Sequence, residues 1–168
     1  VQLSLEDGFA YSKNGFVASI EPAQGVQGTQ VFLYGQDLRG QGDEVVSVTL
    51  SGVTASITRE TNFFVIVIAA SADAGDAGDA VITADTGAVI SKAEGWTYVN
   101  AGNITEIKPE KSSSGAEVLI LGNNLRSGAE AIVKVTLANV AATIVTENNT
   151  VVTVEAGMVN TLDEIVGD

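Results

Sequence analysis

The sequence predicts an all-β protein made of two tandem β-sandwiches. Three observations predict this class: an internal repeat of 87 residues, apolar residues that alternate with Ser, Thr or Gln, and turns that contain Gly, Asn or Asp. Alternation with a period of two is typical of strands that bury one face, whereas the helical spacing of apolar residues is absent. A length of 168 residues accommodates two small domains.

The internal repeat has no gaps. Ile20-Glu21-Pro22 recurs 87 residues later as Ile107-Lys108-Pro109. Further identities at this offset are Gly28 and Gly115, Val31 and Val118, Gly35 and Gly122, Leu38-Arg39 and Leu125-Arg126, Val48-Thr49-Leu50 and Val135-Thr136-Leu137, Ile57 and Ile144, Asn62 and Asn149, Val65 and Val152, and Val67 and Val154. Because a repeat of this kind marks a repeated structural unit, both halves are expected to fold alike.

The N-terminus resembles the end of a unit and not its beginning. Gly8 and Tyr11 match Gly95 and Tyr98 at the same offset. Residues 1–13 are therefore expected to form the terminal strands of a preceding or neighbouring repeat, and residues 14–100 to form a complete domain.

The C-terminal end of the sequence resembles a unit without its last segments. The sequence stops at Gly167-Asp168, which resembles Gly78-Asp79, and in the first unit the strand segment 80–84 follows. Residues 101–168 are therefore expected to form a second domain that lacks its last two strand segments. Residues 1–5 could stand for the first missing segment and residues 8–11 for the second.

Two explanations account for these ends. Either the chain is a window of a longer tandem array, or the N-terminal hairpin of one molecule completes the truncated domain of the next by strand addition. If strand addition occurs, the interface is expected to consist of five apolar or aromatic residues: Val1, Leu3, Leu5, Phe9 and Tyr11. Both explanations imply head-to-tail assembly; a third is that the ends of the sequence do not coincide with those of the domains.

Alternating segments predict strands of the first unit at residues 30–35, 46–50, 55–58 and 81–84. Polar turns within residues 56–65 and 143–152 predict a hairpin in each unit. Roughly seven short strands per unit are typical of an immunoglobulin-like sandwich.

Each unit resembles the IPT/TIG immunoglobulin-like domain. The shared pattern is an Ile-x-Pro start, a Gly-containing turn, an alternating strand that ends in Gly, an Asn or Asp followed by Leu or Phe, and a valine-rich strand. The first unit supplies Ile20-Glu21-Pro22, Gly28-Thr29, residues 31–38 and Val46-Ser47-Val48; the second supplies Ile107-Lys108-Pro109, Gly115, residues 118–125 and Val133-Lys134-Val135. This resemblance implies the fold but no single function, because the family includes receptor ectodomains, surface arrays, modules of glucan-processing enzymes and DNA-binding modules.

Composition excludes several classes of function. The chain has no His and no Cys, which removes Ser-His-Asp triads, Cys nucleophiles and His or thiolate metal sites, so no enzymatic activity is expected. A formal net charge of −13 opposes binding to nucleic acid and to anionic membrane surfaces. The longest apolar run, residues 63–70, is too short for membrane insertion.

The acidic loop of residues 73–79 is a candidate calcium site. Asp73, Asp76 and Asp79 place a carboxylate at every third residue, and Ca²⁺ favours clustered oxygen ligands on flexible loops. The spacing is not that of an EF-hand, so the alternative is a solvated loop that keeps one end of the sandwich soluble. No other cofactor is expected.

Two Asn-x-Thr sequons begin at Asn103 and Asn148. They are candidate N-glycosylation sites if the chain enters a eukaryotic secretory pathway. Asn148 falls in a predicted hairpin turn, where a glycan would be tolerated.

Aromatic residues near the unit junction allow two interpretations. Trp96 and Tyr98, which match Phe9 and Tyr11, lie on an alternating strand. An exposed pair would form a carbohydrate-binding platform, whereas an aromatic repeated in each unit favours packing in the core or between domains. The pair Phe63-Phe64 is expected to place one ring inside and one on an outer face.

These observations predict a structural repeat module of an extracellular or cell-surface protein. It would assemble head-to-tail into an array or filament, with copies of itself or adjacent repeats as its partners. The alternatives are a glycan- or protein-binding adhesion module, or an accessory domain of a polysaccharide-processing enzyme.

Overall fold

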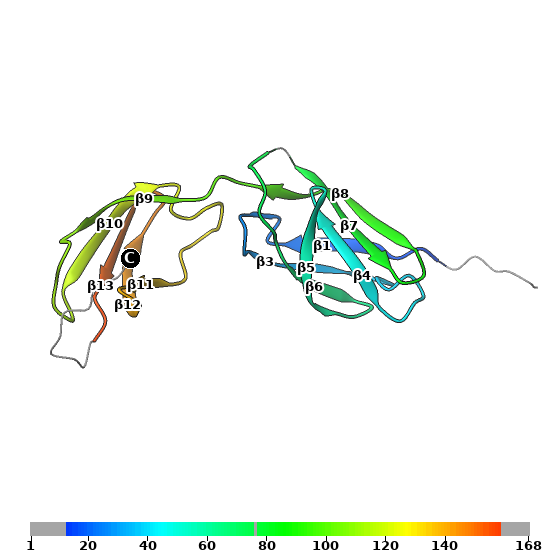
Figure 1. Ribbon diagram of the computed structural model, residues 1–168, viewed down its shortest axis with the longest axis horizontal. Helices are drawn as coiled ribbons and strands as arrows, with labels where there is room; N and C mark the ends of the chain where they lie inside the picture. The colour runs from blue at the N-terminus through cyan, green and yellow to red at the C-terminus, as the bar shows by residue number, and fades with distance from the viewer. Residues whose placement is uncertain (1–12, 76, 159–168) are drawn as a thin grey trace, which may run out of the picture. The chain divides into compact units, whose positions relative to one another are not determined.

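The computed structural model describes residues 13–75 and 77–158. These residues form two compact units built from β-strands (Figure 1). Unit 1 contains residues 13–23, 27–72 and 77–97, and unit 2 contains residues 24–26, 73–75 and 98–158. The predicted fold class, all-β with two tandem immunoglobulin-like domains, is confirmed.

Thirteen strands occur in the described part of the chain: β1 (Phe16–Glu21), β2 (Gln24–Gly25), β3 (Gln30–Gln36), β4 (Val45–Leu50), β5 (Val53–Glu60), β6 (Phe64–Ile68), β7 (Gly78–Ala84), β8 (Val89–Tyr98), β9 (Asn103–Lys108), β10 (Glu117–Asn123), β11 (Val135–Leu137), β12 (Val140–Glu147) and β13 (Val151–Glu155). The four strands predicted in the first unit correspond to β3, β4, β5 and β7. The two predicted hairpins are β5–β6 and β12–β13.

Unit 1 is organised around a continuous strand order of β1-β3-β6-β5-β4-β7-β8. Strand β5 links two layers, because its first residues pair with β4 and its last residues pair with β6. Apolar side chains that alternate along these strands fill the space between the layers. The fully buried ones are Val31, Leu33, Val48, Leu50, Val65, Val67, Ala80, Ile82 and Trp96, and Leu38 joins them from the loop after β3.

Steric crowding explains why β3 and β10 each contain a glycine. A Cβ atom on Gly35 would lie 2.1 Å from the backbone oxygen of Phe16, and one on Gly122 would lie 2.2 Å from the backbone oxygen of Asn103. Any larger residue would force the neighbouring strand away. The Gly of the predicted motif therefore allows β1 and β9 to pair closely with β3 and β10.

The strand bounds reproduce the sequence repeat. Strands β9, β10, β12 and β13 begin and end 87 residues after β1, β3, β5 and β6. The sheet of unit 2 has the order β11-β12-β13-β10-β9, which is the order of the matching strands in unit 1. Strand β11 matches only the last half of β4, and the described residues of unit 2 contain no counterpart of β7 or β8.

Some predicted residues lie outside the described ranges. They are the interface residues Val1, Leu3, Leu5, Phe9 and Tyr11, and the central carboxylate of the acidic loop, Asp76. Within residues 13–75 and 77–158, no helix has the length and apolar character that a membrane crossing requires.

Candidate functional site

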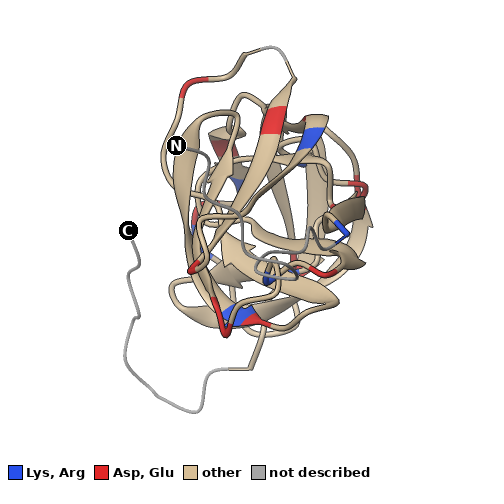
Figure 2. Cartoon of the chain, turned by 90° about the vertical axis from the view of Figure 1, so that its right-hand side faces the viewer, with Lys and Arg blue, Asp and Glu red and all other residues tan. Residues whose placement is uncertain are grey.

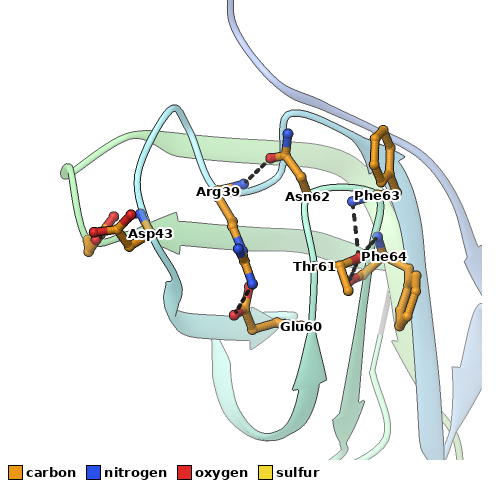
Figure 3. Close-up of polar contacts among 8 residues, drawn as sticks. Arg39, Asp43, Glu60, Thr61, Asn62, Phe63 and Phe64 are labelled. Atoms are coloured by element: carbon orange, nitrogen blue, oxygen red, sulfur yellow. Dashed lines mark hydrogen bonds and ion pairs between the residues drawn. The ribbon is translucent and has the colours of Figure 1, made fainter.

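A bidentate ion pair fixes the loop after β3 (Figure 3). The Nε and Nη2 atoms of Arg39 each donate a hydrogen bond of 2.9 Å to one carboxylate oxygen of Glu60. The Oδ1 atom of Asn62 accepts a bond of 3.2 Å from the backbone N–H of Arg39, and its Nδ2 donates to Asp37. These bonds hold the loop against the hairpin of β5 and β6.

The same arrangement recurs in unit 2. Arg126 donates two bonds of 2.9 Å to Glu147, and Asn149 Oδ1 accepts a bond of 3.1 Å from the backbone N–H of Arg126. Hydrogen bonding by Arg126 holds the pKa of Glu147 below its usual range, and hydrogen bonding by Glu147 raises the pKa of Arg126. Because each charge is satisfied by its partner, we assign both pairs a structural role. The available sequence signal was the recurrence of Arg, Glu and Asn at one offset.

The aromatic residues at the end of β8 are buried. Trp96 has no exposed surface, and Tyr98 is 3% exposed. Burial also raises the pKa of the Tyr98 hydroxyl. An exposed carbohydrate platform on these two residues is therefore excluded, and the packing interpretation agrees with their burial.

The turn before β6 places two rings near the surface (Figure 3). Thr61 Oγ1 accepts hydrogen bonds from the backbone N–H groups of Phe63 and Phe64, at 3.2 and 3.0 Å. Phe63 is 66% exposed, and Phe64 is half-buried on the outer side of β6. The expectation that one ring enters the core is wrong, because Val65, the next residue along the alternating strand, takes the inward position.

Unit 1 carries an outward-facing group of aromatic and apolar side chains that the sequence analysis missed. We call it the aromatic face; its members are Phe32, Tyr34, Arg59, Phe64 and Ile66. Tyr34 pairs with Phe64 across β3 and β6, and Phe32 pairs with Ile66. The rings of Phe32 and Tyr34 are parallel within 11° with centroids 6.1 Å apart, and the guanidinium of Arg59 lies 5.4 Å from the centroid of Phe64.

The matching face of unit 2 has no aromatic residue. At the offset of 87, the aromatic face corresponds to Leu119, Leu121, Thr146, Val151 and Thr153. Period-two alternation predicts that such residues point outward but not that they lie beside one another. The face therefore distinguishes two units that otherwise share their framework.

A second candidate surface lies in unit 2. In unit 1, four apolar residues of β1 and β4 are buried: Val17, Ile20, Val48 and Leu50. Their counterparts on β9 and β11 are Ile104, Ile107, Val135 and Leu137, of which Ile104 is 56% exposed and the others are partly exposed. We call these four residues the open side of unit 2.

The open side includes a strand edge. In unit 1, the backbone N–H of Ser51 donates to the backbone oxygen of Asp79, and Thr49, two residues earlier, pairs with Val81 of β7. The counterpart of Thr49 is Thr136 on β11. Strand β11 is the outermost strand of its sheet in the described part of the chain, so this edge corresponds to one that β7 covers in unit 1.

The acidic loop contributes to the fold. Asp79 Oδ1 accepts a hydrogen bond of 3.1 Å from the backbone N–H of Glu94, and Asp73 is exposed. Residues 13–75 and 77–158 contain no group of three acidic side chains that could hold a metal ion. The third member of the predicted calcium set, Asp76, is outside these ranges, so calcium binding by the full set stays a prediction.

Both sequons are at the surface. Asn148 is exposed in the turn between β12 and β13, and its Oδ1 accepts bonds from the backbone N–H groups of Thr150 and Val151, at 2.8 and 2.9 Å. Asn103 is the exposed first residue of β9, and Thr105 donates from its hydroxyl to the Leu121 backbone oxygen. Both asparagines remain candidate glycosylation sites.

Asp and Glu positions are scattered over strands and loops, with few Lys and Arg positions between them (Figure 2). Such a distribution provides solubility and favours no single anion-binding patch.

Comparison with protein families decides the nature of unit 2. Residues 103–162 match the model of the IPT/TIG domain. Unit 2 is an IPT/TIG domain. Unit 1 is a second β domain, which shares the order of five strands and the ion pair with the described part of unit 2 and also contains β7 and β8. The resemblance that the sequence motifs indicated is confirmed for residues 103–162.

Solved structures with a similar fold include multidomain extracellular proteins. One structure of the plexin A4 extracellular region is 20% identical over 89% of this chain and 13% of that chain, with a TM-score of 0.66. A second plexin A4 structure is 16% identical over 86% of this chain and 15% of that chain, with a TM-score of 0.56. A surface glycan-binding protein from Prevotella bryantii is 13% identical over 89% of this chain and 38% of that chain, with a TM-score of 0.42. No curated protein matches the chain.

The chain spans only 13 to 38% of the length of these three proteins. At such low identity the likeness concerns the fold alone.

Proposed function

We propose that this chain is a non-catalytic structural module of an extracellular or cell-surface protein, and that it assembles head-to-tail through the open side of unit 2. The observation that carries this proposal is that Ile104 is 56% exposed and Ile107, Val135 and Leu137 are only partly buried against the core of unit 2, whereas their counterparts in unit 1 are buried. The extracellular setting of the proposal is supported by the similar fold of the plexin A4 extracellular region.

Covering the open side would stabilise unit 2 in two ways. Complete burial of a Val, Leu or Ile side chain is worth roughly 1.5–3 kcal/mol, of which part remains to be gained at each of these residues. An added strand would also satisfy the edge of β11 with backbone hydrogen bonds. Because the open side lies on one unit only, such contacts join unlike surfaces and can propagate from copy to copy.

The experiment is to measure the mass of the purified chain by light scattering over a range of concentrations and to image it by electron microscopy. We expect oligomers that lengthen with concentration. The variant Thr136→Pro removes a backbone N–H that faces away from β12, so it should block strand addition and leave the β11–β12 hairpin intact. Circular dichroism checks that the variant is folded.

The matched control is Val145→Glu, which places a charge on an exposed residue of β12 away from this edge. It should assemble as the unmodified chain does. A chain that stays monomeric at all concentrations, or a Thr136→Pro variant that assembles normally, would overturn the proposal.

A second candidate function is binding of a neutral glycan, and the observation that favours it is the aromatic face. Exposed Tyr and Phe rings pack against sugar rings, and their presence on one unit only is what a binding role would require. The rim is polar, with Gln30, Gln36 and Ser56 on the same strands. A net charge of −13 opposes anionic polysaccharides and leaves neutral ones as the fitting class.

Affinity gel electrophoresis tests this candidate. Xyloglucan and mixed-linkage β-glucan serve as probes, because both are neutral polysaccharides. Retardation of the unmodified chain should be lost in Tyr34→Ala/Phe64→Ala and kept in the matched unit 2 variant Leu121→Ala/Val151→Ala. Equal migration with and without both polysaccharides, or equal retardation of both variants, would count against this candidate.

A further inference from the structure

We propose that the aromatic face of unit 1 binds the same face of a second copy, related by a two-fold axis that runs along the strand direction. The contact is separate from the open side of unit 2 and uses a different surface. It is carried by a row of four outward residues on four neighbouring strands: Glu21 on β1, Phe32 on β3, Ile66 on β6 and Arg59 on β5. We call them the cross-strand row.

The register of the strands places these four residues side by side. Glu21 pairs with Phe32, and Phe32 pairs with Ile66. Ile66 pairs in turn with Arg59. The neighbours of Phe32 and of Ile66 along their strands are fully buried, so the row lies on the outer side of the sheet. It therefore has an acidic residue at one end, a basic residue at the other and two apolar residues between them.

The middle of this face carries no charge. Strands β3 and β6 contain no Asp, Glu, Lys or Arg, although the chain has 21 acidic and 8 basic residues. The phenylalanines of the described ranges, Phe16, Phe32, Phe63 and Phe64, all lie on or next to β1, β3 and β6, and none belongs to the buried core. Aromatic residues and Arg are enriched in protein interfaces, whereas Asp and Glu are depleted. Two acidic chains can therefore approach with little repulsion at this face.

A two-fold axis along the strand direction reverses the row in the second copy. Glu21 of each copy then meets Arg59 of the other, and the apolar residues between them meet each other, so every contact occurs twice. Tyr34 and Phe64, which form the next pair along β3 and β6, meet in the same way. Sheets that pack face to face with nearly aligned strands are common in β-sandwiches. An axis across the strands would instead place β1 on β1 and bring like charges together.

Glu21 and Arg59 favour a second copy over a glycan as the occupant of this face. Both side chains are exposed, and neither forms an ion pair within residues 13–75 and 77–158. A neutral glycan would give neither of them a charged partner. A second copy pairs both, and such complementary charges fix the register of an interface.

The matching row of unit 2 is not self-complementary. At the offset of 87 it consists of Lys108, Leu119, Thr153 and Thr146, which pair in the same order. Lys108 already forms an ion pair of 2.7 Å with Glu106 of its own strand. A two-fold axis would bring Lys108 against the uncharged Thr146. Unit 2 therefore supplies the matched control.

Reversal and exchange of charge test the contact. The variants are made in the Thr136→Pro background, where strand addition at β11 is blocked, and sedimentation equilibrium should find monomers and dimers only. Arg59→Glu should raise the dissociation constant of the dimer by about tenfold, because the axis repeats each lost ion pair. Glu21→Arg/Arg59→Glu should restore most of the affinity, since the exchanged charges again meet their opposites.

Lys108→Glu is the control with the same change of net charge, and it should leave the dissociation constant unchanged. Circular dichroism checks that each variant is folded. If Arg59→Glu dimerised as the parent does, or if the exchange failed to restore dimers, the two-fold contact would be refuted. A parent chain that stayed monomeric but was retarded by xyloglucan would also refute it and assign the face to a glycan.

The two assemblies are distinguished by their size. Oligomers that lengthen in the unmodified chain, together with a strictly monomeric Thr136→Pro variant, would support the open side and overturn the two-fold dimer. An unmodified chain that stops at dimers, with the expected response to charge exchange, would support the two-fold dimer and overturn head-to-tail assembly.

Discussion

Arg126 and Glu147 form a bidentate ion pair that repeats, with the same distances of 2.9 Å, the pair of Arg39 and Glu60 in unit 1. Each pair ties the loop after the second strand of its unit to the hairpin that follows. The two units therefore share this ion pair, although their outer faces differ.

The ion pair predicts an acid-sensitive unit 2. The pKa of Glu147 is lowered in the folded chain, so its pairing stabilises unit 2 above the ordinary pKa of Glu, about 4.3. This stabilisation is lost as the pH falls through the lowered pKa. Thermal unfolding from about pH 7 to about pH 3 should show a falling melting temperature in the unmodified chain, and a smaller fall in Glu147→Gln.

The exposed Glu155→Gln on β13 is the matched control for this measurement. It should leave the pH dependence unchanged. If the melting temperature depended on pH in the same way in Glu147→Gln and in the unmodified chain, the structural role assigned to the Arg126–Glu147 ion pair would be wrong.

The burial of Trp96 predicts a stability effect and not a binding effect. Trp96→Ala removes a fully buried ring, and such substitutions cost about 3–5 kcal/mol. Urea unfolding followed by far-UV circular dichroism should show a large loss of stability in the transition that reports unit 1. The exposed Phe63→Ala should change that free energy little; equal effects of the two variants would refute a core role for Trp96.

The turn between β11 and β12 predicts a stabilising substitution. Ala138 adopts a φ of 46° and Asn139 a φ of 65°, in the left-handed region that disfavours Ala. Ala138→Gly should therefore stabilise unit 2 by about 1 kcal/mol, measured by thermal or urea unfolding. Ala142→Gly, on the adjoining strand, should destabilise it instead; stabilisation by both would contradict the backbone argument.

The calcium hypothesis predicts a ligand effect on stability. Binding by Asp73, Asp76 and Asp79 in the native state alone would raise the melting temperature when calcium is added, and a chelator would reverse the rise. Asp73→Asn should abolish the rise, whereas Asp43→Asn, in a different loop, should retain it. A melting temperature that is indifferent to calcium would support the alternative of a solvated loop.

Short-range patterns were enough to predict the strands. Val31 and Leu33 alternate with outward residues, and both point into the core as a period of two requires. The offset of 87 was equally informative, because it relates the bounds of four strand pairs without error.

Contacts between distant segments could not be predicted in this way. Arg39 and Glu60 are separated by 21 residues, and only the packing of the loop on the hairpin brings them together. Tyr34 and Phe64 meet through the register of β3 and β6, which alternation along one strand does not specify. The prediction for Phe63 and Phe64 failed for a related reason, since the turn decides which residue begins the inward series.

The open side of unit 2 makes folding and association parts of one equilibrium. If a neighbour adds a strand to the edge of β11, the free energy of unit 2 contains a concentration term, so unit 2 would be less stable in dilute chains than in assembled ones. Unit 2 would then become stiffer only when the molecules assemble. The terminal unit of any array would remain the softest, and it would be the place where the next copy adds or the last one leaves.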